Sequence, residues 1–331
     1  MLMSNGVREV FFTVIIPTRN RPELCKLALD SVVAQSFLGF EVIVVNDGST
    51  DEFLPSYKAM ESNYGDNVSF YYQRSRPNGH GQSYSMNTGA YAAKGQYLCF
   101  LDDDDWWTDT EHLQRAYNTI TDSDEEVDAY YSNQAAYYPS GEKKLENVWV
   151  EDLAEKLTGR IADEFGAYKV DAEFLFLSQG FAHLNCSIVR RDLYLSIKGM
   201  DENIRYECDR DIYIRVVDAA KTLFYSPMFI ARHNIPNPQY KDNMSTLVSY
   251  FEKQLYRTTV YEKAVVFSRK PCIKRNSEFG LATVFKHSTE EYIRSKQWSQ
   301  ARIYARKALA VKFSFKWWLF TLFVSARSLF D

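Results

Sequence analysis

The sequence lacks the features that mark several common classes of protein. Its 331 residues include only five cysteines, an odd number without a CxxC pair, which argues against a disulfide framework or a zinc knuckle and favours a reducing compartment. No stretch reaches the roughly 18–20 apolar residues that a transmembrane helix needs, and the first residues have no signal-peptide layout. We therefore expect a cytoplasmic protein, with any membrane contact peripheral and at the inner face of the cytoplasmic membrane.

Basic charge and dinucleotide-binding glycines are missing as well. Lysine and arginine number 39 against 43 acidic residues, a net charge of −4, which argues against a nucleic-acid partner. No GxGxxG motif follows the first apolar run, where Pro17-Thr18-Arg19-Asn20 stands instead, and this argues against a dinucleotide oxidoreductase.

Apolar and aromatic residues, by contrast, are plentiful. Hydrophobic residues make up 46% and aromatic residues 15% of the chain. The length suffices for one α/β domain of about 230–250 residues with a smaller appendage. Aromatic rings stack on sugars and bases as well as filling cores, so their abundance suggests a carbohydrate ligand.

Strand-like and helix-like segments alternate over the first third of the chain. Runs of β-branched and aromatic residues predict strands, and apolar residues at helical spacing predict helices. Strands are expected at residues 10–16, 41–45, 68–73 and 96–101, the first ended by Pro17, with helices at 21–35 and 83–93. This order predicts an α/β fold with a mostly parallel sheet flanked by helices.

Polar segments follow three of these strands: Pro17–Arg21, Asn46–Asp51 and Asp102–Asp105. In open parallel sheets, ligands bind beyond the carboxyl ends of the strands. We therefore expect the three segments to gather at one edge of the sheet and form a binding site.

The four aspartates 102–105 carry the strongest chemical signal. Adjacent carboxylates repel one another and raise each other's pKa unless a cation compensates. Oxygen ligands suit Mg²⁺ or Mn²⁺, and diphosphate oxygens would complete the shell. A solvated turn or helix cap is the alternative for these residues. Asp47 likewise either accepts hydrogen bonds from a base or ribose or belongs to a simple Asx-Gly turn.

The blocks TVIIPTRNRPELC, VIVVNDGSTDE, NTGAYAAKGQYLCFLDDDDWW and RRDLYLSIKGMDENIRYECDRDIYIRV resemble, in order and spacing, those of glycosyltransferase family 2. The resemblance extends over residues 11–233. It implies a GT-A fold, Rossmann-like, and an inverting enzyme that uses a nucleotide-diphosphate sugar.

By that resemblance, the nucleotide-sugar site would consist of Pro17, Thr18, Arg19, Asp47, Asn87, Asp102 and Asp103. Asp102 would lie near the ribose, and Asp104 would bind a Mn²⁺ or Mg²⁺ ion that bridges the diphosphate. His233, in FIARHNIP, resembles the family's late histidine, which joins the metal shell. A lone histidine is more often a satisfied core or surface residue, and that alternative applies to His233 and to His183, in a loop expected to face the acceptor.

The catalytic base is expected between Glu207 and Asp211. Asp209 aligns with the family's base, while Cys208 stands at its usual glutamate and Arg210 at its usual tryptophan. Glu207 therefore stays an alternative base, and an acidic first helical turn is the non-catalytic interpretation of both. One carboxylate suffices to deprotonate an acceptor hydroxyl as it attacks the anomeric carbon.

The resemblance ends before the C-terminal part of the chain. We expect a transferase domain at 1–240 and a helical region at 241–331. Residues 312–330 are aromatic and basic without an acidic residue, and would lie on a membrane surface or pack on the domain or in a homodimer.

These observations predict a transferase that passes a sugar from a UDP-hexose or UDP-N-acetylhexosamine to a hydroxyl of a glycan or lipid-linked acceptor in cell-surface polysaccharide biosynthesis. The alternative is a catalytically inactive nucleotide-sugar-binding protein of the same fold. The setting rests on family analogy.

Overall fold

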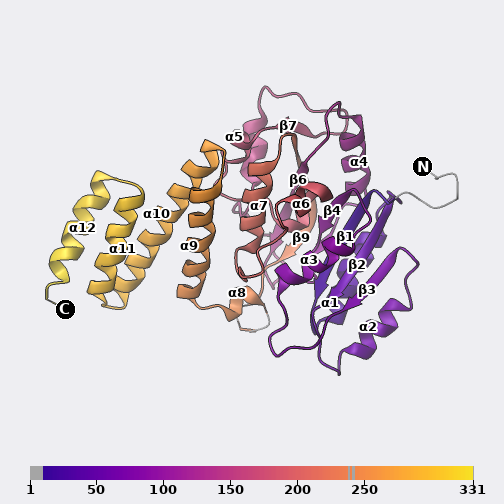
Figure 1. Ribbon diagram of the computed structural model, residues 1–331, viewed down its shortest axis with the longest axis horizontal. Helices are drawn as coiled ribbons and strands as arrows, with labels where there is room; N and C mark the ends of the chain where they lie inside the picture. The colour runs from indigo at the N-terminus through magenta and orange to yellow at the C-terminus, as the bar shows by residue number, and fades with distance from the viewer. Residues whose placement is uncertain (1–9, 238, 241–242, 331) are drawn as a thin grey trace. The chain divides into compact units, whose positions relative to one another are not determined.

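The computed structural model describes residues 10–237, 239–240 and 243–330 (Figure 1). The N-terminal residues 1–9, on which the signal-peptide prediction rests, lie outside the described residues. The chain divides into two compact units, Met1–Tyr240 and Lys241–Asp331.

One mixed sheet forms the centre of the first unit, with strand order β3-β2-β1-β4-β8-β6-β9-β5 and β7 paired to β9. The strands are Phe12–Thr18 (β1), Phe40–Asn46 (β2), Val68–Tyr72 (β3), Tyr97–Phe100 (β4), Trp106–Trp107 (β5), Ala129–Tyr137 (β6), Tyr168–Val170 (β7), Ser187–Arg190 (β8) and Leu223–Asn234 (β9). β1 pairs in parallel with β2 and β4, and β2 with β3, as predicted. β8 pairs antiparallel with β4 and β6, while β6 and β9 are parallel.

Helices cover this sheet (Figure 1). They are Pro22–Val33 (α1), Leu54–Glu61 (α2), Gln82–Ala92 (α3), His112–Asp122 (α4), Ala172–Leu175 (α5), Arg191–Ser196 (α6) and Cys208–Ala219 (α7), with 3₁₀ turns Glu151–Leu157 (η1) and Leu184–Cys186 (η2). α1 has Pro22 in its first turn, where the missing backbone N–H costs nothing. α7 begins at Cys208, so Asp209 lies in its first turn.

Contrary to the prediction, Pro17 does not end the first strand, since β1 continues to Thr18. The carbonyl of Ile15 accepts a hydrogen bond from Leu101 just past the end of β4, whereas the carbonyl of Thr18 accepts one from Asp47 after β2. Neighbours along a strand point to opposite sides, so Pro17 faces the side where β4 has already ended. The ladder loses no hydrogen bond there, which is why a proline is tolerated.

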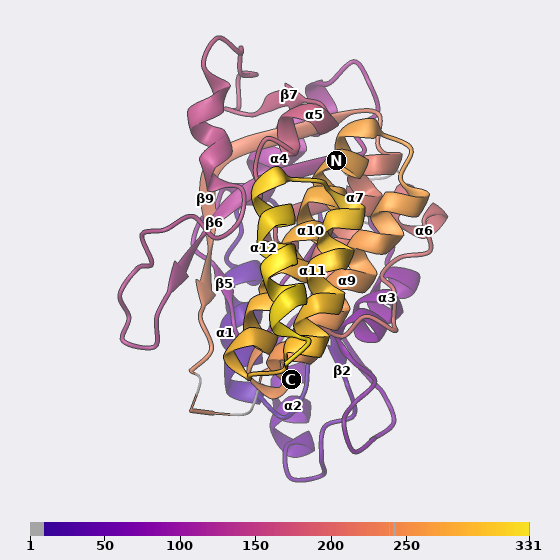
Figure 2. The ribbon, with the colours of Figure 1, turned by 90° about the vertical axis from the view of Figure 1, so that its left-hand side faces the viewer.

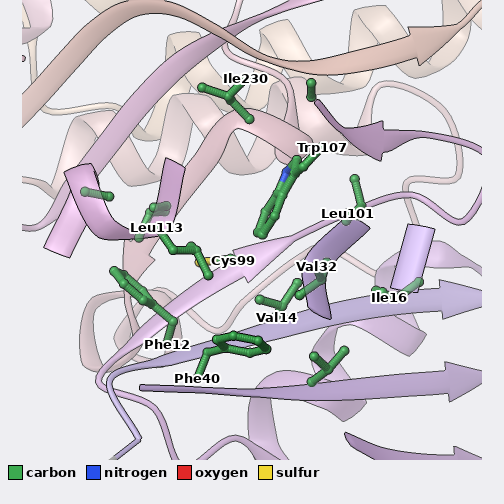
Figure 3. Close-up of a cluster of buried hydrophobic side chains, with 14 of the residues drawn as sticks. Phe12, Val14, Ile16, Val32, Phe40, Cys99, Leu101, Trp107, Leu113 and Ile230 are labelled. Carbon is green, nitrogen blue, oxygen red and sulfur yellow. The ribbon is translucent and has the colours of Figure 1, made fainter. Parts of the chain in front are cut away.

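A buried core joins this part of the sheet to α1 and makes the strand ends a fixed platform. Figure 3 shows side chains from β1, β2, β4 and α1 packed together with Trp107 and Leu113. The labelled members are Phe12, Val14, Ile16, Val32, Phe40, Cys99, Leu101, Trp107, Leu113 and Ile230, all buried. The polar segments that follow β1, β2 and β4 therefore start from rigid positions.

The second unit is helical over its described residues, as predicted. Its helices are Met244–Leu247 (α8), Tyr250–Phe267 (α9), Pro271–Arg294 (α10), Trp298–Val311 (α11) and Phe315–Arg327 (α12). α9 packs on α10, α10 on α11 and α11 on α12, so these four helices form a row (Figures 1 and 2). Among the described residues, no helix is both long and apolar enough to cross a membrane.

Candidate active site

Asp105 holds together the chain segments that surround the aspartate cluster. Its Oδ2 accepts hydrogen bonds from Asn185 Nδ2 and His233 Nδ1, both at 2.7 Å, and its Oδ1 accepts the backbone N–H of Asn234 at 2.8 Å. The loop after β4 is thereby joined to the end of β9 and to the turn before β8. The sequence assigned no role to Asp105, and the structure makes it an anchor.

Asp102 lies at the centre of the site. Its Oδ1 accepts a hydrogen bond from Gln82 Nε2 at 2.6 Å, and its backbone N–H donates to Asn185 Oδ1 at 2.9 Å. Burial, followed by the negative charges of Asp105 and Asp104, raises the pKa of Asp102 well above its usual range. A cation bound here would favour the ionised form of Asp102, against both burial and the neighbouring carboxylates.

Arg21 offsets part of that charge. Its Nη2 lies 2.7 Å from Asp103 Oδ1, and its Nη1 lies 3.0 Å from Asp104 Oδ2. Burial lowers the pKa of Arg21, but the two carboxylates outweigh burial and raise it. Burial also raises the pKa of Asp103 to about 7, against the opposing effect of Arg21. Arg21 lies in the polar segment after β1, but the sequence did not single it out.

Two histidines with different charge states face the cluster. Burial lowers the pKa of His233, but the charge of Asp105 and its hydrogen bond outweigh burial and raise the pKa to about 9. For His183, burial and then the charge of His233 lower the pKa to about 3. The two ring centroids are 5.4 Å apart, and the Trp149 ring packs edge-on against both. At neutral pH, His233 is therefore cationic and His183 is neutral.

The two candidate bases stand at the start of α7. Glu207 adopts the left-handed conformation at φ 64°, which costs a residue with a Cβ about 1–2 kcal/mol. Its carboxylate accepts a hydrogen bond from Arg210 Nε at 2.6 Å, while Asp209 Oδ1 accepts the backbone N–H of Arg210 at 2.8 Å. Burial and then the charge of Glu207 raise the pKa of Asp209 to about 6.

His183 connects Asp209 with the aspartate cluster. Its Nε2 lies 3.8 Å from Asp102 Oδ2 and 3.8 Å from Asp209 Oδ2. Its Nδ1 accepts the backbone N–H of Asn185, so the neutral ring carries its proton on Nε2, between the two carboxylates. The structure thus brings together three residues that are far apart in the sequence.

Asp47, after β2, holds the loop between β3 and α3. Its two oxygens accept the backbone N–H groups of His80 at 2.7 Å and Gly81 at 2.9 Å. Gly79 has φ +62°, and a Cβ there would lie 2.4 Å from Asp47 Oδ2, so this approach requires glycine.

The other residues predicted for the base pocket lie beside the same loop or beneath it. Arg19 Nη2 donates to the carbonyls of Arg76 and Pro77 at 2.9 and 3.0 Å. The Thr18 hydroxyl bonds to the Tyr57 hydroxyl at 2.7 Å. Pro17 is buried in β1.

Asn87 occupies a different environment. Its Nδ2 donates to the Met200 carbonyl and to Glu202, and its Oδ1 accepts from the Tyr194 hydroxyl and the Met200 backbone N–H. All of its polar atoms are engaged with residues 194–202, so the observed role of Asn87 is to hold that segment. A contact with the nucleotide sugar stays a prediction.

The donor set fits a divalent cation. Asp102, Asp105 and His183 each offer one ligand atom, and these atoms lie within 4.8 Å of one another. Carboxylate oxygens suit Mg²⁺, and carboxylates with imidazole suit Mn²⁺. Binding through His183 Nε2 would release its proton. The predicted ligands Asp104 and His233 contact Arg21 and Asp105 instead, so their ligand roles stay predictions.

Comparison with known proteins identifies the family of this chain. The model of glycosyl transferase family 2 matches residues 13–195, more than half of the chain. The chain belongs to glycosyltransferase family 2. Among its curated relatives is the amylovoran biosynthesis glycosyltransferase AmsB of Erwinia amylovora, 27% identical over 210 residues. That match covers 63% of this chain and 64% of AmsB, so this chain spans less than two thirds of the length of AmsB.

Solved glycosyltransferases share the fold of this family 2 chain. S. aureus TarS 1–349 in complex with UDP-GlcNAc matches with a TM-score of 0.65 at 15% identity, covering 96% of this chain and 88% of that one. Mannosyltransferase PcManGT from Pyrobaculum calidifontis, in complex with GDP-Man and Mn²⁺, matches at 0.59 and 16% identity, covering 97% and 86%. At such low identities, these matches show the fold alone. The two matches confirm the predicted GT-A architecture.

Several residues that form the site were not identified from the sequence. Asn185 and Asn234 each lie within two residues of a histidine that had been singled out, so adjacency was an available signal. Gln82, at the start of α3, and Trp149, just before η1, carry no such local signal. Their roles follow from contacts between distant parts of the chain.

Proposed function

We propose that this family 2 member transfers a sugar from a UDP-hexose or UDP-N-acetylhexosamine to a hydroxyl of a glycan or lipid-linked acceptor, with inversion. The complex of TarS with UDP-GlcNAc supports the nucleotide. The name of AmsB, an amylovoran biosynthesis glycosyltransferase, supports a role in cell-surface polysaccharide synthesis.

One observation carries the proposal. Asp102, the first of the four clustered aspartates, and Asp209, the expected base, both lie 3.8 Å from the same nitrogen of His183. A donor bound at the aspartate cluster would therefore present its anomeric carbon close to a carboxylate on the acceptor side. Inverting transfer needs this arrangement, because attack occurs opposite the leaving group.

Asp209 is the base in this mechanism. Its pKa of about 6 leaves it ionised at neutral pH and basic enough to accept a proton. The carboxylate of Glu207 is engaged by Arg210, which favours Asp209 over Glu207. As the acceptor oxygen bonds to the anomeric carbon, its proton passes to Asp209. The bond from that carbon to the diphosphate breaks, and the diphosphate leaves with the electron pair.

Asp102, Asp105 and His183 would hold a Mn²⁺ or Mg²⁺ ion, with Asp104 and His233 as alternative ligands. The bound ion would stabilise negative charge on the leaving diphosphate. Asp103 is held by Arg21 beside these residues. The base of the nucleotide would bind near Pro17, Thr18, Arg19 and Asp47, under the loop of residues 76–81.

Calorimetric titration of UDP, GDP and dTDP, with Mn²⁺ and with EDTA, tests the nucleotide assignment. We expect metal-dependent binding of UDP that Asp102→Ala removes, and release of UDP from a UDP-sugar only when an acceptor is supplied. Preference for GDP would contradict the donor assignment. Tight UDP binding without transfer to any glycan or lipid-linked acceptor would favour the inactive nucleotide-sugar binder.

A further inference from the structure

Helix α12 presents most of its large apolar side chains outward. Its packed side carries Trp317, whose Nε1 donates to the Ala305 carbonyl, and the buried residues Thr321, Val324 and Ser328. The opposite side carries Phe315, Trp318, Leu319, Leu322 and Phe323, which are 39–65% exposed. We call these five residues the α12 outer face. Their spacing of three and four residues places them on one side of the helix.

The α12 outer face continues at both ends of the helix. Phe313 before α12 and Leu329 and Phe330 after it are 69–82% exposed. α12 stands at the end of the row of helices and packs against α11, as Figure 2 shows for the two yellow helices. Contiguous apolar patches on a protein surface mark sites of interaction.

The segment of sequence that contains this face carries charges of one sign. Residues 292–330 contain eight basic residues and no acidic residue: Arg294, Lys296, Arg302, Arg306, Lys307, Lys312, Lys316 and Arg327. Residues 241–331 as a whole contain 17 basic and 7 acidic residues, a net of +10. The first 240 residues, with 22 basic and 36 acidic, carry −14, so the overall net charge of −4 conceals a strongly basic second unit.

We propose that the α12 outer face docks on a bilayer surface that contains anionic lipid. An apolar stripe with aromatic rings suits the boundary between headgroups and acyl chains, and flanking cations suit lipid phosphates. With 13 residues, α12 is too short to cross a bilayer and would lie in its plane.

Charge also decides between this occupant and the alternatives. A second copy of the chain would bring two basic faces together, and their repulsion opposes such a dimer. An acidic polymer would match the cations but leave the apolar stripe uncovered. A bilayer with anionic headgroups would cover the apolar stripe and also match the cations.

Vesicle co-sedimentation of the full chain tests the proposal without reference to sugar transfer. We expect binding to mixed phosphatidylcholine–phosphatidylglycerol vesicles, at least about tenfold weaker binding to phosphatidylcholine alone, and weakening with salt. Lys312→Gln with Lys316→Gln should weaken binding to the mixed vesicles by about fivefold per charge.

The apolar half is tested by a triple variant, Trp318→Ser, Leu322→Ser and Phe323→Ser. It should lose at least about tenfold in vesicle affinity. The matched control is Leu255→Ser, Val266→Ser and Phe267→Ser, which changes three apolar residues on α9 that are more exposed than those on α12, and it should bind as the wild type does. Circular dichroism and UDP titration check that both variants fold.

Three results would overturn the proposal. The wild-type chain could stay in the supernatant with mixed vesicles, or the triple variant could bind them as well as its control does. The third result is a concentration-dependent dimer, seen by light scattering and abolished by the triple variant, in a protein that does not bind vesicles. This third result would assign the face to another copy of the chain, and none of the three would bear on the proposed sugar transfer.

Discussion

Arg210 binds the carboxylate of Glu207 through Nε at 2.6 Å, three residues along the chain. Asp209, between them, turns Oδ2 towards His183 and takes no part in that ion pair. Two acidic residues that the sequence could not rank as bases therefore have different surroundings. One is paired beside a strained backbone turn, and the other faces the site.

We expect Asp209→Asn to lower kcat by about 10²–10⁴-fold, because the amide cannot accept the proton. UDP affinity should change by less than about threefold, since the proposed nucleotide contacts are elsewhere. The matched change is Glu207→Gln, which should cost kcat less than about tenfold. Steady-state kinetics with UDP titration measure both. A larger kcat loss in Glu207→Gln than in Asp209→Asn would reverse the assignment.

The pH dependence of transfer should follow Asp209. The base works only when ionised, so kcat/KM should rise with pH through about 6 and level off above it. The charge of Glu207 raises the pKa of Asp209, so Glu207→Gln should move this acidic limb to lower pH. A pH–rate profile of the two proteins tests this. A limb that stays in place in Glu207→Gln would contradict Asp209 as the titrating group.

The loop of residues 76–81 should be needed for nucleotide binding. In Gly79→Ala, the new Cβ would meet Asp47 Oδ2 at 2.4 Å, displacing either the loop or the carboxylate. We expect UDP affinity to fall by about tenfold or more.

Gly141→Ala is the matched control for Gly79→Ala. Gly141 also has positive φ, +86°, but its Cβ would meet nothing within 4 Å. Both variants carry the same kind of backbone strain, so a difference in UDP affinity by calorimetry isolates the contact with Asp47. Equal affinities would show that the approach of Gly79 to Asp47 does not matter for binding.

The first four strands and the acidic edge were predictable because their signals are local. Continuous apolar runs predict buried parallel strands, and the residues after them must lie at one edge. The position of the antiparallel strand β8 between β4 and β6 was not predictable, because a strand of four residues carries no local signal that selects its neighbours in the sheet. The prediction that β1 ends at Pro17 was wrong, because a proline is tolerated in a strand where the neighbouring strand has already ended.

Within the site, residue types were easier to predict than partners. The aspartates, Glu207 and both histidines were named as candidates from the sequence, but Arg21 as the partner of Asp103 and Asp104 was not. Such pairings join segments some 80 residues apart, and nothing local in the sequence selects among the available cations.

Arg21 should matter for stability as well as for the site. Asp103 is 2% exposed, and Arg21→Gln would leave its buried carboxylate without its counter-charge, which typically costs about 3–5 kcal/mol of unfolding free energy. Arg21 lowers the pKa of Asp103, so its loss should raise that pKa above about 7 and extend protonation of the carboxyl to higher pH. Because a protonated Asp103 needs no counter-charge, the loss of unfolding free energy should be smaller at about pH 6 than at about pH 8.

Urea denaturation at the two pH values measures this loss. Lys26→Gln is the control, since the exposed ion pair of Lys26 with Asp30 should contribute less than about 1 kcal/mol. Equal losses in the two variants, or no dependence on pH, would mean that Arg21 does not hold Asp103 as the structure indicates.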